Sequence, residues 1–338
     1  MTADTPVPVM PTEPTAPASR CENCGAVLLG EHCYSCGQPT KGLIRQFSDI
    51  IGDFLDTVLN IDARIFRTLG PLLVHPGRVS LEYFAGHRVR FVSPVRLFVF
   101  LSIATFLVAR WVAPDIHAET DNKGSISLTQ AATPTNAAAN SAATPPSAQE
   151  DDNFDFNGKP WNASSNPVAV AWLGSTGNTW FNNLIGRAKI NVERTRHDPN
   201  AFKNAVLGAM PTALFLLLPI FALLLKIAYL FKRRLYMEHL VVALHSHAFL
   251  CIGTLILICL SQLQSWIGTS SGFLHGLAGW ASAAVWIWMP TYLLIMQKRI
   301  YGQGWLMTLL KFFSLGLVYV VLLSLGLAAT MLATLVWM

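Results

Sequence analysis

A basic tip between two long apolar runs is the feature that most limits the folds open to this chain. Lys232, Arg233 and Arg234 are consecutive, and apolar sequence of membrane-spanning length lies on both sides of them. Cationic loops stay on the cytosolic side during membrane insertion, so the tip sets the direction of both neighbouring segments. Only 13% of the residues are charged and 52% are hydrophobic, whereas soluble domains carry roughly 25% charged residues. The sequence therefore predicts an all-α polytopic membrane protein.

Five segments are predicted to span the membrane. The first, at 94–113, is the weakest, because Arg96 and Arg110 must extend towards the headgroups to complete a crossing. The other four spans are expected at 205–231, 238–263, 273–296 and 305–337. Lys298 and Arg299 mark a second cytosolic turn that agrees with the first. Five spans and two basic turns predict a membrane protein with its N-terminus in the cytosol and its C-terminus outside.

The sequence before the first span is predicted to be cytosolic. Residues 1–20 are rich in proline and are expected to form a disordered tail. Residues 41–93 place apolar side chains at helical spacing with charged side chains between them, as amphipathic helices do. Three such helices are expected, at 43–59, 63–74 and 79–85.

A long polar insert follows the first span. Residues 114–204 interrupt the apolar pattern and include an Ala/Thr/Pro/Asn/Ser stretch at 131–146. Such composition buries too little apolar surface to fold, so we predict a disordered extracytoplasmic insert. One short amphipathic helix is expected near 168–190, where tryptophans are typical of a membrane interface.

Four cysteines form two C-x-x-C pairs, each followed by a glycine: Cys21, Cys24, Cys33 and Cys36. The two-residue gap lets both thiolates of a pair face one ion, and the glycine permits a tight turn whose amides point towards sulfur. We predict a small zinc ribbon at 21–40 that holds a structural Zn²⁺. Zinc thiolates require a reducing compartment, which agrees with a cytosolic N-terminus. Two disulfides are the alternative for the same spacing.

Ionisable side chains gather at the membrane boundary next to the basic tip: Glu238, His239, His245 and His247. Glu238 and His245 are seven positions apart and share a helical face, whereas the other two histidines point elsewhere. Ionisable groups in membrane segments are costly and are candidates for function. A structural role is the favoured interpretation, in which Glu238 pairs with Arg233 or Arg234 and His245 and His247 bond to a neighbouring helix. A proton, ion or substrate path and a metal or haem site are the alternatives.

Arginines beside the apolar faces of the cytosolic helices suggest contact with anionic lipid headgroups: Arg64, Arg67, Arg88 and Arg90. Solvated arginines on helices that pack against the bundle are the alternative. The net charge of +5 is modest and no continuous basic and aromatic stripe is present, which argues against a nucleic-acid partner.

The chain resembles a family of bacterial integral membrane proteins described as domain of unknown function 3667. The resemblance rests on these motifs: Cys21-x-x-Cys24-Gly25, Cys33-x-x-Cys36-Gly37-Gln38, Thr68-Leu69, Pro76-Gly77, Glu82-Tyr83, Gly86-x-Arg88, Pro94, Arg96, Glu238-His239-Leu240, His245 and Tyr301-Gly302-Gln303. It covers residues 20–112 and 200–338 and implies this architecture, a location in a bacterial inner membrane and a metal knuckle. It implies no activity.

Three functions are compatible with these features. The first is a non-enzymatic assembly or regulatory module with a cytosolic zinc knuckle, favoured because no coherent set of catalytic residues is present. The second is a transporter or channel for a small solute, ion or proton that uses Glu238 and His245. The third, a membrane-embedded metalloenzyme, requires a second metal.

Overall fold

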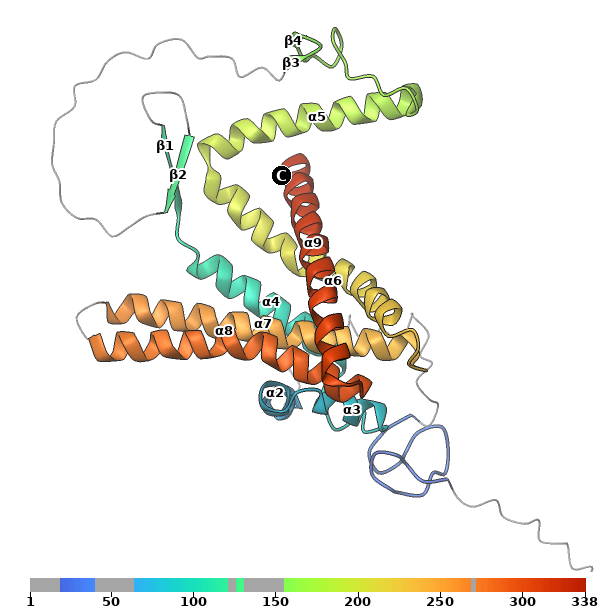
Figure 1. Cartoon of the computed structure of the whole chain (residues 1–338). Helices are drawn as coiled ribbons and strands as arrows, with labels where there is room; N and C mark the ends of the chain where they lie inside the picture. Colours follow the sequence, from blue (N-terminus) through green and yellow to red (C-terminus); the bar gives the residue numbers. More distant parts are fainter. Residues whose placement is uncertain (1–18, 40–63, 121–125, 131–154, 269–271) are drawn as a thin grey trace, which may run out of the picture. The chain divides into compact units, whose positions relative to one another are not determined.

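The computed structural model describes residues 19–39, 64–120, 126–130, 155–268 and 272–338 (Figure 1). Within these residues, five helices are long and apolar enough to cross a membrane. They are α4 (Pro94–Val112), α6 (Pro199–Ala228), α7 (Tyr236–Ile267), α8 (Gly272–Tyr301) and α9 (Trp305–Trp337). The predicted all-α membrane architecture is therefore confirmed. The predicted tail, except for its last two residues, and the helix expected at 43–59 lie outside the described residues.

The observed start of α6 has a local cause that the apolar pattern does not reveal. Asp198 accepts a hydrogen bond of 2.9 Å from the backbone N–H of Ala201, as an N-cap does. Pro199 occupies the first helical position, where a residue without an N–H is tolerated. The helix therefore begins before the apolar run expected at 205–231, and it continues through Pro211 and Pro219.

Two short helices precede the first span, close to their predicted positions. They are α2 (Arg64–Val74) and α3 (Arg78–Phe84). Gly77 precedes α3 with a φ of 76°, in the left-handed region that glycine adopts without strain. A Cβ on Gly77 would lie 3.4 Å from Ile300 and 3.5 Å from Met296. The turn between α2 and α3 therefore packs directly against the last part of α8.

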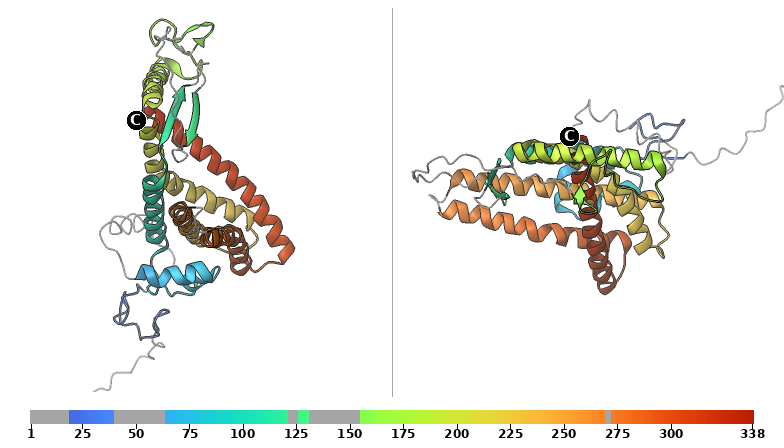
Figure 2. Two further views of the ribbon diagram at one scale, coloured as in Figure 1. Left: turned by 90° about the vertical axis from the view of Figure 1, so that its left-hand side faces the viewer. Right: turned by 90° about the horizontal axis from the view of Figure 1, so that it is seen from above.

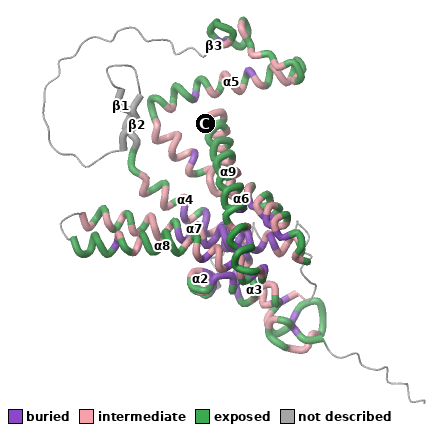
Figure 3. The backbone as a smooth tube through the Cα atoms, viewed as in Figure 1, coloured by how far each residue is buried: buried purple, intermediate pink, exposed green. Residues whose placement is uncertain are grey.

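The chain divides into two compact units. The first contains Met1–Ser102, Leu218–Thr254 and Gly279–Gly316. In this unit the first half of α7 lies beside the last part of α8, where Phe249 and Tyr292 stack with centroids 3.7 Å apart (Figures 1 and 2). Buried residues concentrate in the first half of α4, up to Ser102, and in this half of α7 (Figure 3). This unit contains the cysteine pairs and all four ionisable residues of the predicted boundary cluster.

The second unit contains Ile103–Leu217, Leu255–Ala278 and Leu317–Met338, and so includes the insert predicted at 114–204. Before α6, the insert has two antiparallel hairpins and a helix: β1 (Ile116–Thr120) with β2 (Ile126–Gln130), β3 (Asp155–Phe156) with β4 (Lys159–Pro160), and α5 (Gly174–His197). The helix expected near 168–190 is thus present but displaced towards the C-terminus. The low-complexity stretch at 131–146 lies outside the described residues.

Part of the insert has regular structure beyond the one helix expected there, although the rest of 114–204 was predicted to be disordered. Asparagine side chains supply hydrogen bonds to backbone groups in this part. Asn182 is buried and accepts a hydrogen bond of 3.1 Å from the indole of Trp161. The same side chain accepts from the backbone N–H of Val168 at 2.9 Å and donates to its carbonyl at 2.8 Å. These bonds hold an extended segment on α5 without a large apolar core.

Candidate metal centre and its attachment to the membrane helices

The cysteine segment consists of two turns with the same backbone hydrogen bonds. In the first turn Cys21 donates to Ala26 and Gly25 donates to Cys21, each at 2.8 Å. In the second turn Cys33 donates to Gln38 and Gly37 donates to Cys33, again at 2.8 Å. Gly25 and Gly37 have positive φ, 76° and 73°, which glycine adopts without strain in a tight turn of the predicted kind. Each turn therefore presents its two cysteines to the same side.

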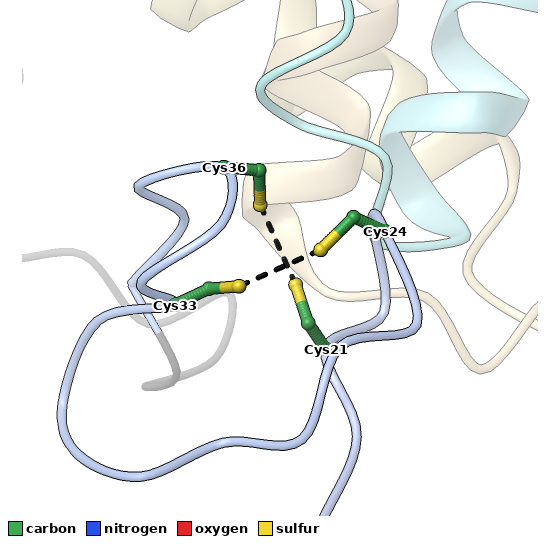
Figure 4. A group of neighbouring side chains, drawn as sticks. All are labelled: Cys21, Cys24, Cys33 and Cys36. Atoms are coloured by element: carbon green, nitrogen blue, oxygen red, sulfur yellow. Dashed lines mark hydrogen bonds between the residues drawn. The ribbon is translucent and has the colours of Figure 1, made fainter.

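The four cysteine sulfurs converge on one point (Figure 4). They all lie within 4.8 Å of one another, and two Sγ–Sγ distances are 3.6 Å (Cys21 to Cys36) and 3.5 Å (Cys24 to Cys33). Tetrahedral zinc with bonds of about 2.3 Å would separate its sulfurs by about 3.8 Å. A disulfide needs about 2.05 Å, and all of these cysteines are free. The cluster could therefore hold a metal ion, and the disulfide alternative is not formed.

The cysteine knuckle, residues 20–39, is fastened to the turn that follows α3. The side-chain amide of Gln38 is buried and donates a 2.7 Å hydrogen bond to the carbonyl of Gly86. Gly86 has a φ of 95°, and a Cβ there would lie 2.3 Å from a carboxylate oxygen of Glu22. Only glycine allows this close approach of Glu22. The knuckle therefore contacts Gly86 twice, through Gln38 at its carbonyl and through Glu22 at its Cα.

Basic side chains surround Glu82 on α3. His87 lies 2.6 Å from the Glu82 carboxylate, Arg90 lies 3.7 Å away and Arg78 3.8 Å away. The hydrogen bond with His87, helped by the positive charge of Arg90, lowers the pKa of Glu82. Glu82 is thus held ionised and orients the turn that carries Gly86.

Buried contacts connect α2 and α3 to membrane helices of the same unit. Ser80 on α3 and His245 on α7 are almost completely buried, and Ser80 Oγ lies 2.8 Å from His245 Nδ1. The indole of Trp288 on α8 donates to the carbonyl of Leu73 at 3.0 Å. These bonds tie the short helices, and through Gly86 the cysteine knuckle, to α7 and α8.

Glu238 stabilises the start of α7. One carboxylate oxygen accepts from Arg234 at 2.9 Å, and the other accepts from the backbone N–H of Leu235 at 2.8 Å. Arg234 also donates to the carbonyl of Ile300 at 2.9 Å. Glu238 and His245 therefore have different partners in this unit: Glu238 bonds at the start of α7, and His245 bonds to α3. They share a helical face, but their bonds do not connect them to each other.

The remaining two histidines of the predicted boundary cluster, His239 and His247, also have hydrogen-bond partners. His239 Nδ1 lies 2.8 Å from the hydroxyl of Tyr301, which stacks on Tyr229 with centroids 3.6 Å apart. His247 donates from Nδ1 to the carbonyl of Ala243 in its own helix at 2.8 Å. Among the described residues, the four cysteines are the only group of three or more histidine, cysteine, aspartate or glutamate side chains positioned to hold a metal.

Sequence reasoning did not identify two residues that organise this region, Ser80 and Tyr229. Ser80 lies in a helix whose pattern indicates only amphipathic character, and its partner is 165 positions away in the sequence. Tyr229 is the first residue after α6, in the turn that leads to the basic tip, and its hydroxyl donates to Gln297 at 3.0 Å. A polar aromatic residue at the end of an apolar run was the only available signal, and it is a weak one.

Part of the chain matches a known protein family. No curated protein and no solved structure matches the chain. The matched region, residues 62–106, contains α2, α3 and the first part of α4, and so includes the turn that receives the cysteine knuckle. Residues 62–106 match the family described as "Protein of unknown function (DUF3667)", and the resemblance noted in the sequence is thereby confirmed over that region.

Proposed function

We propose that this protein is a structural, assembly or regulatory module of the bacterial inner membrane. In this proposal a Zn²⁺ ion holds the cysteine knuckle in a shape that docks on the membrane helices at their cytosolic ends. Four thiolates form the usual ligand set of a closed structural zinc site, which leaves no position for a substrate. The proposed role is therefore to present a surface, and it requires no catalysis.

The observation that carries this proposal is the attachment of the cysteine knuckle at Gly86. Gln38 follows the second C-x-x-C pair directly, and its hydrogen bond reaches the turn after α3. A metal that shapes this pair also positions Gln38, because binding energy at structural zinc sites is folding energy. Metal occupancy would thus be transmitted through α3 to His245 on α7.

The orientation of the chain is also part of the proposal. Each of the five apolar helices has one end in each compact unit, so the chain passes between the units five times. The knuckle and the basic tip belong to one unit, and the insert and the C-terminus belong to the other. The five described spans and the basic tip, which is retained inside, support a cytosolic N-terminus and an extracytoplasmic C-terminus.

Anionic headgroups of the cytosolic leaflet are the proposed lipid partner of the arginines in α2 and in the turn after α3. Arg67 and Arg90 are exposed, and Arg88 lies near the ring of Tyr83, 5.8 Å from its centroid. Basic residues beside a membrane gain about 1 kcal/mol each from the negative surface potential. The side chain of Arg64, also predicted as a contact, lies outside the described residues.

The surroundings of Glu238 and His245 favour a structural role over transport. A residue on a proton or ion path needs access to water, whereas Glu238 caps a helix and His245 is almost completely buried against Ser80. A metalloenzyme would need a second metal site, and the described histidines do not gather into one.

The double substitution Cys21→Ser/Cys24→Ser tests the proposal, with Cys259→Ser as the control because Cys259 is an exposed cysteine outside the metal cluster. We expect the double variant to lose the single zinc per chain, to expose 20–39 to protease and to disturb abundance or complex formation. Metal analysis, limited proteolysis of membranes and pull-down with the full chain provide these measurements. Normal abundance, interactions and phenotype in a zinc-free double variant would remove the proposed role of the knuckle.

A further inference from the structure

The second compact unit contains a groove that no proposed role of the cysteine knuckle explains. It has a volume of about 720 Å³, within the usual range for small-ligand sites, and lies between the end of α4 and the start of α6. Lys203 on α6 donates to the carbonyls of Pro114 at 2.8 Å and Ala113 at 3.4 Å. These bonds connect the start of α6 to the residues that follow α4, and both segments line the groove.

The side chains that line the groove have a net charge of +1. Arg110 and Lys203 supply two cations, and Asp115, which lies 3.5 Å from Lys203 Nζ, supplies one carboxylate. Within the described part of the chain Arg110 makes no hydrogen bond or ion pair, and its guanidinium is exposed. A free guanidinium in a groove of net charge +1 is complementary to a singly charged anion that can accept paired hydrogen bonds, such as a phosphodiester.

An apolar stripe on α4 leads to this guanidinium. Ile103, Leu107 and Trp111 are spaced four positions apart, so they lie along one helical face, and they are 48%, 64% and 88% exposed. The stripe rises about 10 Å from Ile103 to the level of Arg110. Trp111 stands at the end of a membrane-spanning helix, where tryptophan is typical of the interface between lipid and water.

We propose that this groove binds one anionic phospholipid. Its phosphate lies against Arg110 and its acyl chain follows Ile103 and Leu107 along α4. An amphiphile with a single negative charge matches both the net charge and the adjoining apolar stripe, whereas a soluble anion would leave the stripe uncovered. The site rests on the proposed membrane location of the chain, and it is independent of metal binding at the cysteines.

Native mass spectrometry of the full-length protein released from nanodiscs tests the proposal. The nanodiscs contain equal amounts of phosphatidylglycerol and phosphatidylcholine. We expect one phosphatidylglycerol to be retained per chain, and Arg110→Gln to lower this retention about tenfold, as the loss of a charge-assisted hydrogen bond predicts. The matched control is Arg187→Gln, which changes another exposed arginine of the same unit and should retain the lipid as the unsubstituted protein does.

The outcomes separate the possible occupants. Equal retention of lipid by Arg110→Gln and the unsubstituted protein, or equal retention of both lipids, overturns the site. A lipid-free dimer that dissociates with Arg110→Gln assigns the groove to a second copy and also overturns it. The Cys21→Ser/Cys24→Ser variant should keep the lipid, so a failure of the proposed zinc role leaves this result unchanged.

Discussion

At the scale of single residues, Gly86 decides whether the cysteine knuckle can dock. We predict that Gly86→Ala displaces the knuckle without removing its metal. Alanine at a φ of 95° costs about 1 to 2 kcal/mol, and its Cβ would collide with Glu22. Hydrogen exchange of 20–39 should accelerate, while metal analysis still finds one zinc per chain.

Gly30→Ala is the matched control for this prediction. Gly30 belongs to the same knuckle, lies outside the left-handed region, and has no atom within 4 Å of the place of a new Cβ. It should leave the exchange rates of 20–39 unaltered. Similar acceleration in both variants would show that the knuckle tolerates no side chain at either glycine, and the specific role of Gly86 would be lost.

Ser80 offers a second test at this scale. Ser80→Ala would deprive buried His245 of its hydrogen-bond partner on α3, and a buried polar group without a partner costs about 1 to 3 kcal/mol. We predict a lower thermal unfolding temperature in detergent. Ser246→Ala is the control, since Ser246 is also buried but bonds to Val242 in its own helix and to Met296 on α8 rather than to α3. An equal shift in both variants would contradict a special contribution of the contact between α3 and α7.

At the scale of elements, α7 depends on its first turn. Glu238 accepts from Arg234 and from a backbone N–H that no residue within the helix can pair. We predict that Glu238→Gln destabilises the protein by about 1 to 2 kcal/mol, because it weakens charge-assisted hydrogen bonds. Thermal unfolding of the purified protein measures this loss.

Glu238→Gln also tests whether Glu238 stabilises the start of α7 or takes part in transport. Glu193→Gln is the control, because Glu193 is 61% exposed at the level of its side chain and lies in α5. Proton flux in proteoliposomes should not differ between Glu238→Gln and the control. Flux that is present in the unsubstituted protein and lost only in Glu238→Gln would favour the transporter.

At the scale of the whole molecule, the five crossings make a prediction about sidedness. Protease-cleavable tags inserted after Gly30 and after Gly302 should be protected in right-side-out membrane vesicles, whereas tags after Gly174 and after Met338 should be cleaved. Counting the five described spans from a cytosolic N-terminus places Gly30 and Gly302 inside and Gly174 and Met338 outside. Western blotting of the cleaved products reads the result, and opposite sides for Gly30 and Gly302 would contradict the topology.

Periodicity and spacing were sufficient to predict the membrane helices and the cysteine cluster. A membrane span must be a continuous apolar helix because its backbone has no other partner in lipid. The four thiolates of the knuckle lie close together in the sequence and form one site from local turns. Residue order alone therefore determined α4, α6, α7, α8, α9 and the candidate metal ligands, apart from a few terminal residues.

Only the tertiary structure decided what the ionisable residues of the boundary do. Helical spacing placed Glu238 and His245 on one face, but their partners depend on which helices pack together. Ser80 lies 165 positions from His245, and Gln38 lies 48 positions from Gly86. Packing brings these pairs together, and no local pattern in the sequence encodes such distances. The same reason explains the ordered insert, where asparagine side chains join segments that composition alone assigns to disorder.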